Sequence, residues 1–287
     1  MILTALVDTE TLAQHLADPD WVVFDCRHDL MAPGRARTEY AKSHIPGARF
    51  LHMDEDLSAP KTGKNGRHPL PDPQLFMETL GRAGVDARKQ VVAYDAQGGM
   101  AAARLWWLLR WLGHLPVAVL DGGWNRWVDE GRPQSSDTPQ PKPARFNGTP
   151  RGIAVSAESV RSHLGDGTML LLDARAPDRF RGQNETIDPV GGRIPGALNR
   201  FYRDNLDASG RFKAQEVLNE EFGSILGAID PAKVVNYCGS GVSACHNLLA
   251  MEVAGLRGAR LYAGSWSEWI ADAWRPVASG EPLPGER

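Results

Sequence analysis

The chain has 287 residues, of which 42% are hydrophobic and 23% are charged, a composition typical of folded globular proteins rather than disordered or fibrous ones. Its formal net charge of -3 supplies no basic field able to neutralise many phosphates, so nucleic acid is a poor candidate partner. The sequence has neither a basic and apolar leader at its start nor a run of about 18 uncharged apolar residues, so we expect neither export nor membrane insertion.

The first half contains three short apolar runs, each of which predicts a buried parallel strand. They cover residues 21–24, 91–94 and 118–120. Between the first two, an Ile-Pro-Gly-Ala turn at 45–48 follows His44 and leads into another extended segment. Asp95 follows the second run and begins a Gly-rich loop, after which comes an apolar helix. The third is followed by Asp-Gly-Gly-Trp at 121–124 and by Trp127, which the spacing places on the same helical face.

The same landmarks recur in the same order in the second half. The strands are predicted over residues 169–172, 234–237 and 259–262. An Ile-Pro-Gly-Ala turn at 194–197 follows Arg193. The loop after the second strand begins with Cys238, where that of the first half begins with an aspartate. The third strand leads into Ala-Gly-Ser-Trp at 263–266, with Trp269 three residues further on. The chain is therefore an internal duplication.

Strands that alternate with helical patterns predict parallel sheets with right-handed crossovers and helices on both faces. We therefore expect an α/β fold made of two small, doubly wound domains in tandem. The domains are predicted at 1–132 and 153–287, and a Pro-rich stretch at 133–152 has the composition of an extended linker. The first domain has no cysteine in its Gly-rich loop, so one active site is expected per chain.

The loop that begins at Cys238 carries the strongest chemical signal. Open α/β sheets bind ligands at the carboxyl ends of their strands, where Cys238 is predicted to lie. The residues after it are small, so successive backbone N–H groups can form an anion-binding nest at a helix start. These residues are Gly239, Ser240, Gly241, Val242 and Ser243. Such a site stabilises a thiolate, the form of cysteine that performs nucleophilic sulfur chemistry.

The three cysteines have no paired spacing, so neither a disulfide framework nor a zinc site is predicted, and a reducing compartment such as the cytoplasm fits. Cys245 follows the loop by two helical turns, and Cys26 follows a strand-end aspartate. We expect both to be packing residues. Cys238 could also be an inert buried thiol, but its strand-end position and Gly-rich context favour function.

Three kinds of chemistry use such a loop. A cysteine-dependent phosphatase needs an arginine six residues after the cysteine, where this chain has Ala244. Residues 239–244 formally fit a dinucleotide fingerprint, but the next strand ends at 263–265 without a ribose-binding acid. Persulfide chemistry remains, in which the thiolate takes a donor's sulfur atom and holds it among the N–H groups without a metal or organic cofactor.

The duplicated turn, the Asp-Gly-Gly-Trp segment and the Cys238 loop together resemble the tandem-domain rhodanese family over nearly the whole chain. The neutral loop looks like that of 3-mercaptopyruvate sulfurtransferases, whereas thiosulfate-specific relatives carry basic residues just after the cysteine. The resemblance implies that Cys238 takes sulfur from 3-mercaptopyruvate, releases pyruvate and passes the sulfur to a small thiol, thioredoxin or cyanide.

The same resemblance implies roles for three further residues. Arg179 matches an arginine that binds the donor's carboxylate or sulfonate; the alternative is a solvated surface arginine. Ser240 matches a serine proposed to relay a proton, although it could simply fit the tight loop. His44 matches a histidine that the family's first domain presents near the active-site cleft, or it is a turn histidine bonded to the backbone.

Two departures from the family pattern concern the donor. The family's second arginine is absent from residues 186–190, and an acid is absent from residues 34–36. Arg193, which replaces a histidine, could supply the missing positive charge or could point to solvent. Two other functions therefore stay open: a thiosulfate:cyanide sulfurtransferase, and a non-catalytic carrier that receives persulfide from a protein partner.

Overall fold

The computed structural model of the chain describes residues 2–281. Residue 1 of the first predicted domain and residues 282–287 of the second lie outside the described residues. The chain divides into two compact units that exchange short segments. Unit 1 consists of Met1–Ala59, Pro71–Arg151 and Ala208–Phe212, and unit 2 consists of Pro60–Leu70, Gly152–Asp207 and Lys213–Arg287.

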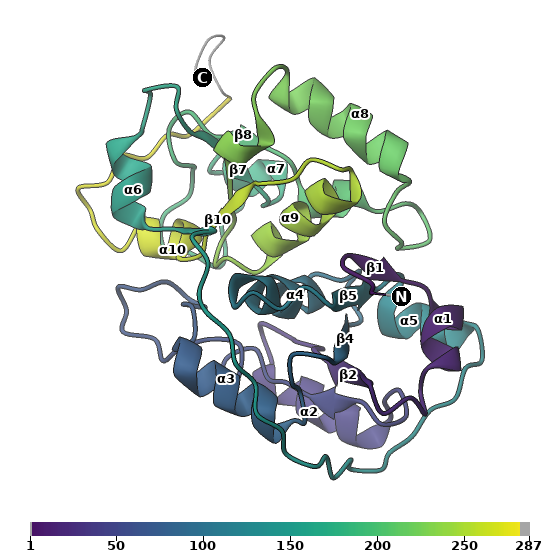
Figure 1. Cartoon of the computed structure of the whole chain (residues 1–287). Helices are drawn as coiled ribbons and strands as arrows, with labels where there is room; N and C mark the ends of the chain where they lie inside the picture. The colour runs from purple at the N-terminus through teal and green to yellow at the C-terminus, as the bar shows by residue number, and fades with distance from the viewer. Residues whose placement is uncertain (1, 282–287) are drawn as a thin grey trace. The chain divides into compact units, whose positions relative to one another are not determined.

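Unit 1 is built on a parallel sheet of five strands in the order β1-β5-β4-β2-β3 (Figure 1). Its strands are β1 (Leu6–Val7), β2 (Trp21–Asp25), β3 (Arg49–Phe50), β4 (Gln90–Tyr94) and β5 (Val117–Leu120). Its helices are α1 (Thr9–Gln14), α2 (Pro33–Lys42), α3 (Pro73–Arg82), α4 (Ala102–Trp111) and α5 (Gly123–Asp129). The predicted strands over 21–24, 91–94 and 118–120 are thus confirmed as β2, β4 and β5.

Helices cover both faces of this sheet. On one face, alternate strand residues such as Val92 and Ala118 pack with Leu12 of α1 and Trp127 of α5. On the other face lies α4, which contacts β4 and β5. All but one of the residues of α4 are buried, as expected for a helix that is hydrophobic on every side.

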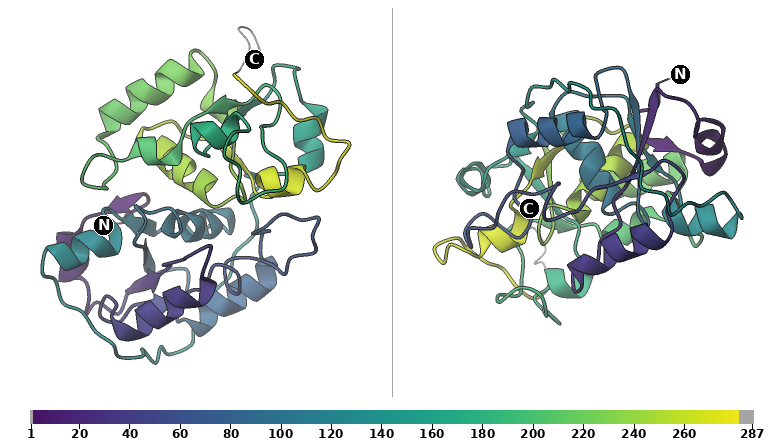
Figure 2. Two further views of the ribbon diagram at one scale, coloured as in Figure 1. Left: turned by 180° about the vertical axis from the view of Figure 1, so that it is seen from behind. Right: turned by 90° about the horizontal axis from the view of Figure 1, so that it is seen from below.

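Unit 2 repeats this topology, with the strand order β6-β10-β9-β7-β8. Its strands are β6 (Ala154–Val155), β7 (Leu170–Asp173), β8 (Leu198–Asn199), β9 (Val234–Tyr237) and β10 (Arg260–Tyr262). Its helices are α6 (Ala157–Ser162), α7 (Pro177–Phe180), α8 (Gln215–Leu226), α9 (Ser243–Val253) and α10 (Ser265–Trp269), with 3-10 turns η1 (Tyr202–Asn205) and η2 (Pro231–Lys233). Two further views show the helices packed around the sheet of each unit (Figure 2). The predicted tandem α/β fold is confirmed.

The repeated sequence landmarks hold the carboxyl ends of the strands together. In unit 2, Arg175 forms a buried ion pair of 2.6 Å with Asp173 at the end of β7, and its guanidinium lies 4.7 Å from the Trp266 ring centroid. The Tyr237 hydroxyl at the end of β9 accepts a hydrogen bond of 3.3 Å from the backbone of Ile194, in the Ile-Pro-Gly-Ala turn. The repeated residues therefore fix the sheet edge on which the Cys238 loop stands.

The same contacts recur in unit 1. Arg27 forms a buried ion pair of 2.6 Å with Asp25 and lies 4.7 Å from the Trp124 ring centroid. The Tyr94 hydroxyl accepts a hydrogen bond of 3.2 Å from the backbone of Ile45. Across residues 2–281, none of the helices has the length and hydrophobicity needed to span a lipid bilayer.

Candidate active site

Cys238 lies directly after β9, before the first turn of α9, and its side chain is 1% exposed. Its Sγ accepts a hydrogen bond of 3.1 Å from the backbone N–H of Gly241. Two backbone hydrogen bonds join the loop to the start of α10. The N–H of Trp266 donates to Cys238 O at 2.9 Å, and that of Ser267 donates to Gly239 O at 2.9 Å. The sulfur is therefore fixed next to a backbone donor at a helix start, as the sequence predicts.

Gly241 is required by the shape of this loop. Its φ of +77° lies in the left-handed region, and a Cβ atom added there would stand 2.2 Å from the backbone oxygen of Ala263. Such a distance admits no side chain unless the backbone moves. The thiol of Cys245, buried in α9, donates to Gly241 O at 3.2 Å and so holds the same residue from inside the helix.

The corresponding loop of unit 1 shows what this backbone shape binds. Asp95, which occupies the position of Cys238, is completely buried. Its carboxylate accepts four backbone N–H groups of its own loop at 2.7 to 2.9 Å, from Gln97, Gly99, Ala101 and Ala102. Burial raises the pKa of Asp95, and these hydrogen bonds oppose that shift. The loop of unit 1 is thus an anion nest filled by its own side chain, and that of unit 2 presents a sulfur atom in its place.

The remaining cysteines are buried packing residues, as expected. Burial raises the pKa of the Cys26 thiol well above its ordinary value, and the nearby carboxylates of Asp25 and Asp95 raise it further. Cys26 is therefore held in the unreactive thiol form.

Ser240 is joined to a histidine that the sequence analysis did not single out. Its Oγ lies 2.8 Å from Nδ1 of His68, and both side chains are buried. His68 comes from residues 60–70, the segment that belongs to unit 2 although it lies within the first half of the chain. Its only sequence signal is its place in a Gly- and Pro-rich stretch without a repeated counterpart.

Arg179, at the end of the short helix α7, is mostly buried, so the solvated alternative is wrong. Its Nε and Nη2 donate to the two carboxylate oxygens of Glu185 at 3.0 and 2.9 Å, and Nη2 also donates to Asp188 at 3.0 Å. Burial alone would raise the pKa of Glu185, but hydrogen bonds from Arg179 and from backbone N–H groups outweigh it and hold that pKa below its ordinary value. Arg179 is thus anchored by the carboxylates of Glu185 and Asp188.

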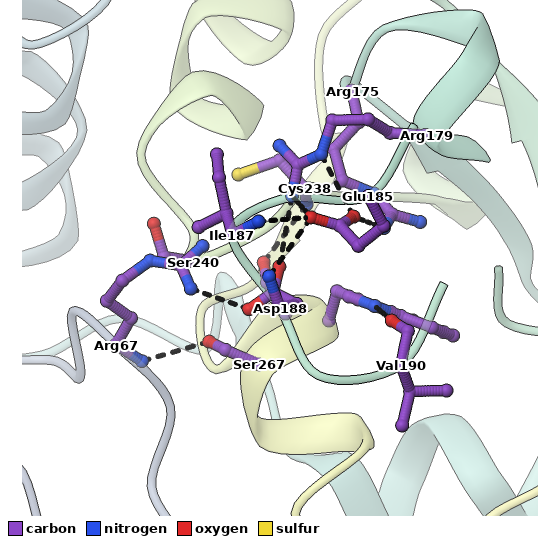
Figure 3. A network of polar contacts seen from close by, with 12 residues as sticks. Arg67, Arg175, Arg179, Glu185, Ile187, Asp188, Val190, Cys238, Ser240 and Ser267 are labelled. Atoms are coloured by element: carbon purple, nitrogen blue, oxygen red, sulfur yellow. Dashed lines mark hydrogen bonds and ion pairs between the residues drawn. The ribbon is translucent and has the colours of Figure 1, made fainter. Parts of the chain in front are cut away.

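A second arginine approaches the same carboxylate. Nη1 of Arg67 lies 2.6 Å from Oδ1 of Asp188, while Arg179 holds Oδ2, so Asp188 bridges two guanidinium groups (Figure 3). Asp188 occupies the stretch in which the family pattern has its second arginine. Arg67 therefore brings a positive charge to that stretch, from the segment that also carries His68.

The two residues that precede the Ile-Pro-Gly-Ala turns lie in different units. His44, in unit 1, is buried; its Nδ1 lies 2.7 Å from Tyr40 O, and its ring stacks on that of Tyr40. These contacts match the alternative of a turn histidine bonded to the backbone. Arg193, in unit 2, is 1% exposed, so the solvent alternative is wrong. It donates to Gly280 O at 2.7 Å and lies over the Phe180 ring.

A fold and a cysteine loop of this kind define a class of protein. The family model of the rhodanese-like domain matches residues 8–130 and again 156–272. The chain therefore belongs to the rhodanese family and contains two copies of its domain.

Individual relatives match over at least 90% of this chain. The chain is 46% identical over 279 residues to a probable 3-mercaptopyruvate sulfurtransferase of Pseudomonas aeruginosa, covering 96% of this chain and 98% of the relative. It is 37% identical to a putative thiosulfate sulfurtransferase of Mycobacterium tuberculosis, covering 90% of each. The structure of 3-mercaptopyruvate sulfurtransferase from Leishmania major superimposes with a TM-score of 0.84 at 28% identity, covering 95% of this chain and 75% of that one.

Proposed function

We propose that the chain is a sulfurtransferase that moves the sulfur of 3-mercaptopyruvate through a persulfide on Cys238 to a thiol or cyanide acceptor. The observation that carries the proposal is the position of the Cys238 sulfur, 3.1 Å from a backbone N–H in a loop whose copy in unit 1 encloses a carboxylate. The neutral loop and the 46% identity to a probable 3-mercaptopyruvate sulfurtransferase favour that donor over thiosulfate.

In the first half-reaction, the Cys238 thiolate attacks the sulfur of the donor thiol. A sulfur–sulfur bond forms and the donor's carbon–sulfur bond breaks, leaving its electron pair on carbon as the enolate of pyruvate, which takes up a proton. In this proposal Ser240 relays that proton, and its hydrogen bond of 2.8 Å with His68 supports the role. The N–H of Gly241 donates to the sulfur of Cys238 and so favours its anionic forms.

In the second half-reaction, the acceptor attacks the outer sulfur and Cys238 leaves as a thiolate. The same N–H group stabilises this leaving group, so one loop serves both displacements. Arg179 binds the anionic group of the donor in this proposal, and His44 and Arg193 stay predictions. A small thiol or thioredoxin is the acceptor that we expect in a reducing compartment such as the cytoplasm.

The proposal is tested by the mass of the intact protein after brief exposure to 3-mercaptopyruvate or thiosulfate without acceptor. We expect one added sulfur atom, mapped to the peptide of Cys238 and formed faster from 3-mercaptopyruvate. Cys238→Ser should take up none, whereas Cys245→Ser, the matched buried control in α9, should still take it up. Faster uptake from thiosulfate would select the thiosulfate enzyme, and no uptake from either donor would indicate a protein-fed carrier.

A further inference from the structure

Unit 2 contains a cavity of about 380 Å³ beside helix α6 and the start of β7, both labelled in Figure 1. Small-molecule sites are mostly apolar cavities of about 300 to 1,000 Å³ with a few polar groups, and this cavity fits that description. Among residues 2–281, its lining includes no member of the Cys238 loop, so it is distinct from the candidate active site. One polar side chain and mainly apolar ones form its walls, among them His163, Val160, Leu164, Met169, Leu171 and Pro195.

The duplication provides a second copy of this part of the fold. Residues 8–25 align with residues 156–173 without a gap. In each copy a helix of six residues, α1 or α6, has a histidine as its C-cap. The loop that follows makes the same backbone hydrogen bond to an aspartate, at 2.9 Å to Asp18 in unit 1 and at 2.8 Å to Asp166 in unit 2. Side chains at matching positions of the two units can therefore be compared.

In unit 1 this framework holds an aromatic ring beside the histidine. The indole of Trp21 packs against the core of that unit. Its ring centroid lies 4.2 Å from that of His15, and the two ring planes make an angle of 87°. Such an edge-to-face arrangement is one that aromatic rings prefer. The matching residues of unit 2 are Met169 and His163, so the second copy keeps the histidine and lacks the indole.

The loop beside the cavity is also smaller in unit 2. Ala17 and Pro19 of unit 1 correspond to Gly165 and Gly167, and a Cβ atom added to either glycine would meet nothing within 4 Å. The ring of His163 is held by its Nδ1, which lies 2.7 Å from Ser159 O. An apolar cavity of this kind stays dry and takes up apolar ligands. Unit 2 therefore offers open space where unit 1 has its own aromatic side chain.

We propose that this cavity binds a small, uncharged, planar aromatic molecule, whose ring takes the place of the Trp21 indole and meets His163 edge to face. The inference goes beyond the proposed function, because neither half-reaction uses this cavity. Burial against the apolar walls supplies the affinity, and His163 favours an aromatic ring over a saturated one. A charged molecule would lose its hydration without gaining an opposite charge from the described residues that line the cavity.

Indole is the probe, because it is the ring system of the Trp21 side chain. Calorimetric titration of the full chain should show one saturable site with a dissociation constant of about 1 mM or below. In protein labelled with ¹³C at the methionine methyl groups, the bound ring should shift the signal of Met169, which Met169→Leu identifies. No saturable binding, or binding that leaves the Met169 signal unmoved, would overturn the inference.

Three variants test the comparison with unit 1. Met169→Trp rebuilds the arrangement of that unit and should weaken indole binding at least about tenfold, because its own ring fills the cavity. Val217→Trp adds the same side chain at an exposed position of α8 and should bind indole like the parent chain. His163→Ala removes the ring contact without filling the cavity and should weaken binding by about 2- to 10-fold, as expected for one aromatic pair.

Urea unfolding establishes that each variant is folded before its affinity is compared. Equal affinities of Met169→Trp and Val217→Trp would refute the site, and an unchanged affinity of His163→Ala would refute the edge-to-face contact. His163→Ala decides the question by itself if Met169→Trp does not fold. The parent chain binds indole in this inference whether or not Cys238 takes up sulfur, so its failure is separate from that of the proposed function.

Discussion

Replacing Gly241 with alanine tests whether the shape of the loop, rather than the presence of Cys238 alone, makes the nucleophile. Gly196 is the matched control, because its φ of +76° is nearly that of Gly241, at +77°, but an added Cβ would meet nothing within 4 Å. Both variants incur the left-handed strain of about 1 to 2 kcal/mol. Only Gly241→Ala also drives a Cβ atom into a backbone oxygen, at 2.2 Å.

That collision forces the loop to move. The movement disturbs the Gly241 N–H donated to Cys238 and the Gly241 carbonyl held by Cys245. Each hydrogen bond contributes about 0.5 to 1.5 kcal/mol, so Gly241→Ala should lower the free energy of unfolding by about 2 to 5 kcal/mol. Loss of a donor to a reacting anion lowers rates by about 100- to 1,000-fold, and we expect a loss of that size in persulfide formation.

Urea unfolding gives the stability of the two variants, and rapid quenching followed by intact-protein mass gives the rate of persulfide formation. Gly196→Ala should lose only the strain energy and keep the rate of the parent chain. If Gly241→Ala forms the persulfide as fast as Gly196→Ala, the loop geometry does not activate Cys238, and the reasoning from the anion nest is refuted.

Two further predictions concern the carboxylates around Arg179. Arg179→Ala should raise the KM for 3-mercaptopyruvate about tenfold or more, because it removes the proposed contact with the donor. It should also lower the free energy of unfolding by about 1 to 3 kcal/mol, because Glu185 and Asp188 lose a partner. An unchanged KM in steady-state assays would leave Arg179 a structural role alone. The lowered pKa of Glu185 means that its ionised form stabilises the fold at neutral pH and that this contribution is lost as the pH falls through the folded pKa. Urea titrations between about pH 7 and about pH 3 should therefore show a smaller loss for Glu185→Gln than for the parent chain, and equal losses would contradict the assignment.

The fold could be predicted from the sequence because each repeated landmark makes a local contact that is the same in both copies. The tyrosine that ends β4 or β9 bonds the Ile-Pro-Gly-Ala turn, and the Asp-x-Arg pair fixes the tryptophan helix. The position of Cys238 was also predictable, since the end of a parallel strand and a Gly-rich loop are both visible in the chain. The boundaries of the predicted strands differ by one residue at Asp25, Gln90, Val117, Leu170, Asp173 and Arg260.

The partners of the nucleophile loop could not be predicted in the same way. His68 and Arg67 meet Ser240 and Asp188 across 172 and 121 residues of chain, and no local periodicity encodes such contacts. Comparison of the two halves directs attention to shared positions, whereas residues 60–70 have no repeated counterpart. The resemblance directs attention to residues 186–190, where an arginine is absent, and not to Arg67, which pairs with Asp188 from elsewhere in the chain.

The membership of Pro60–Leu70 in unit 2 bears on how such a duplicated gene can change. A segment of the first repeat forms part of the unit built from the second, so the two repeats are no longer interchangeable. Deleting the first repeat would remove His68 and Arg67 from the side of Cys238, although that repeat carries an aspartate where a nucleophile would be. Selection that keeps Cys238 therefore also keeps the first repeat, which has Asp95 at the corresponding position. This gives the two repeats a physical reason to stay joined in one chain.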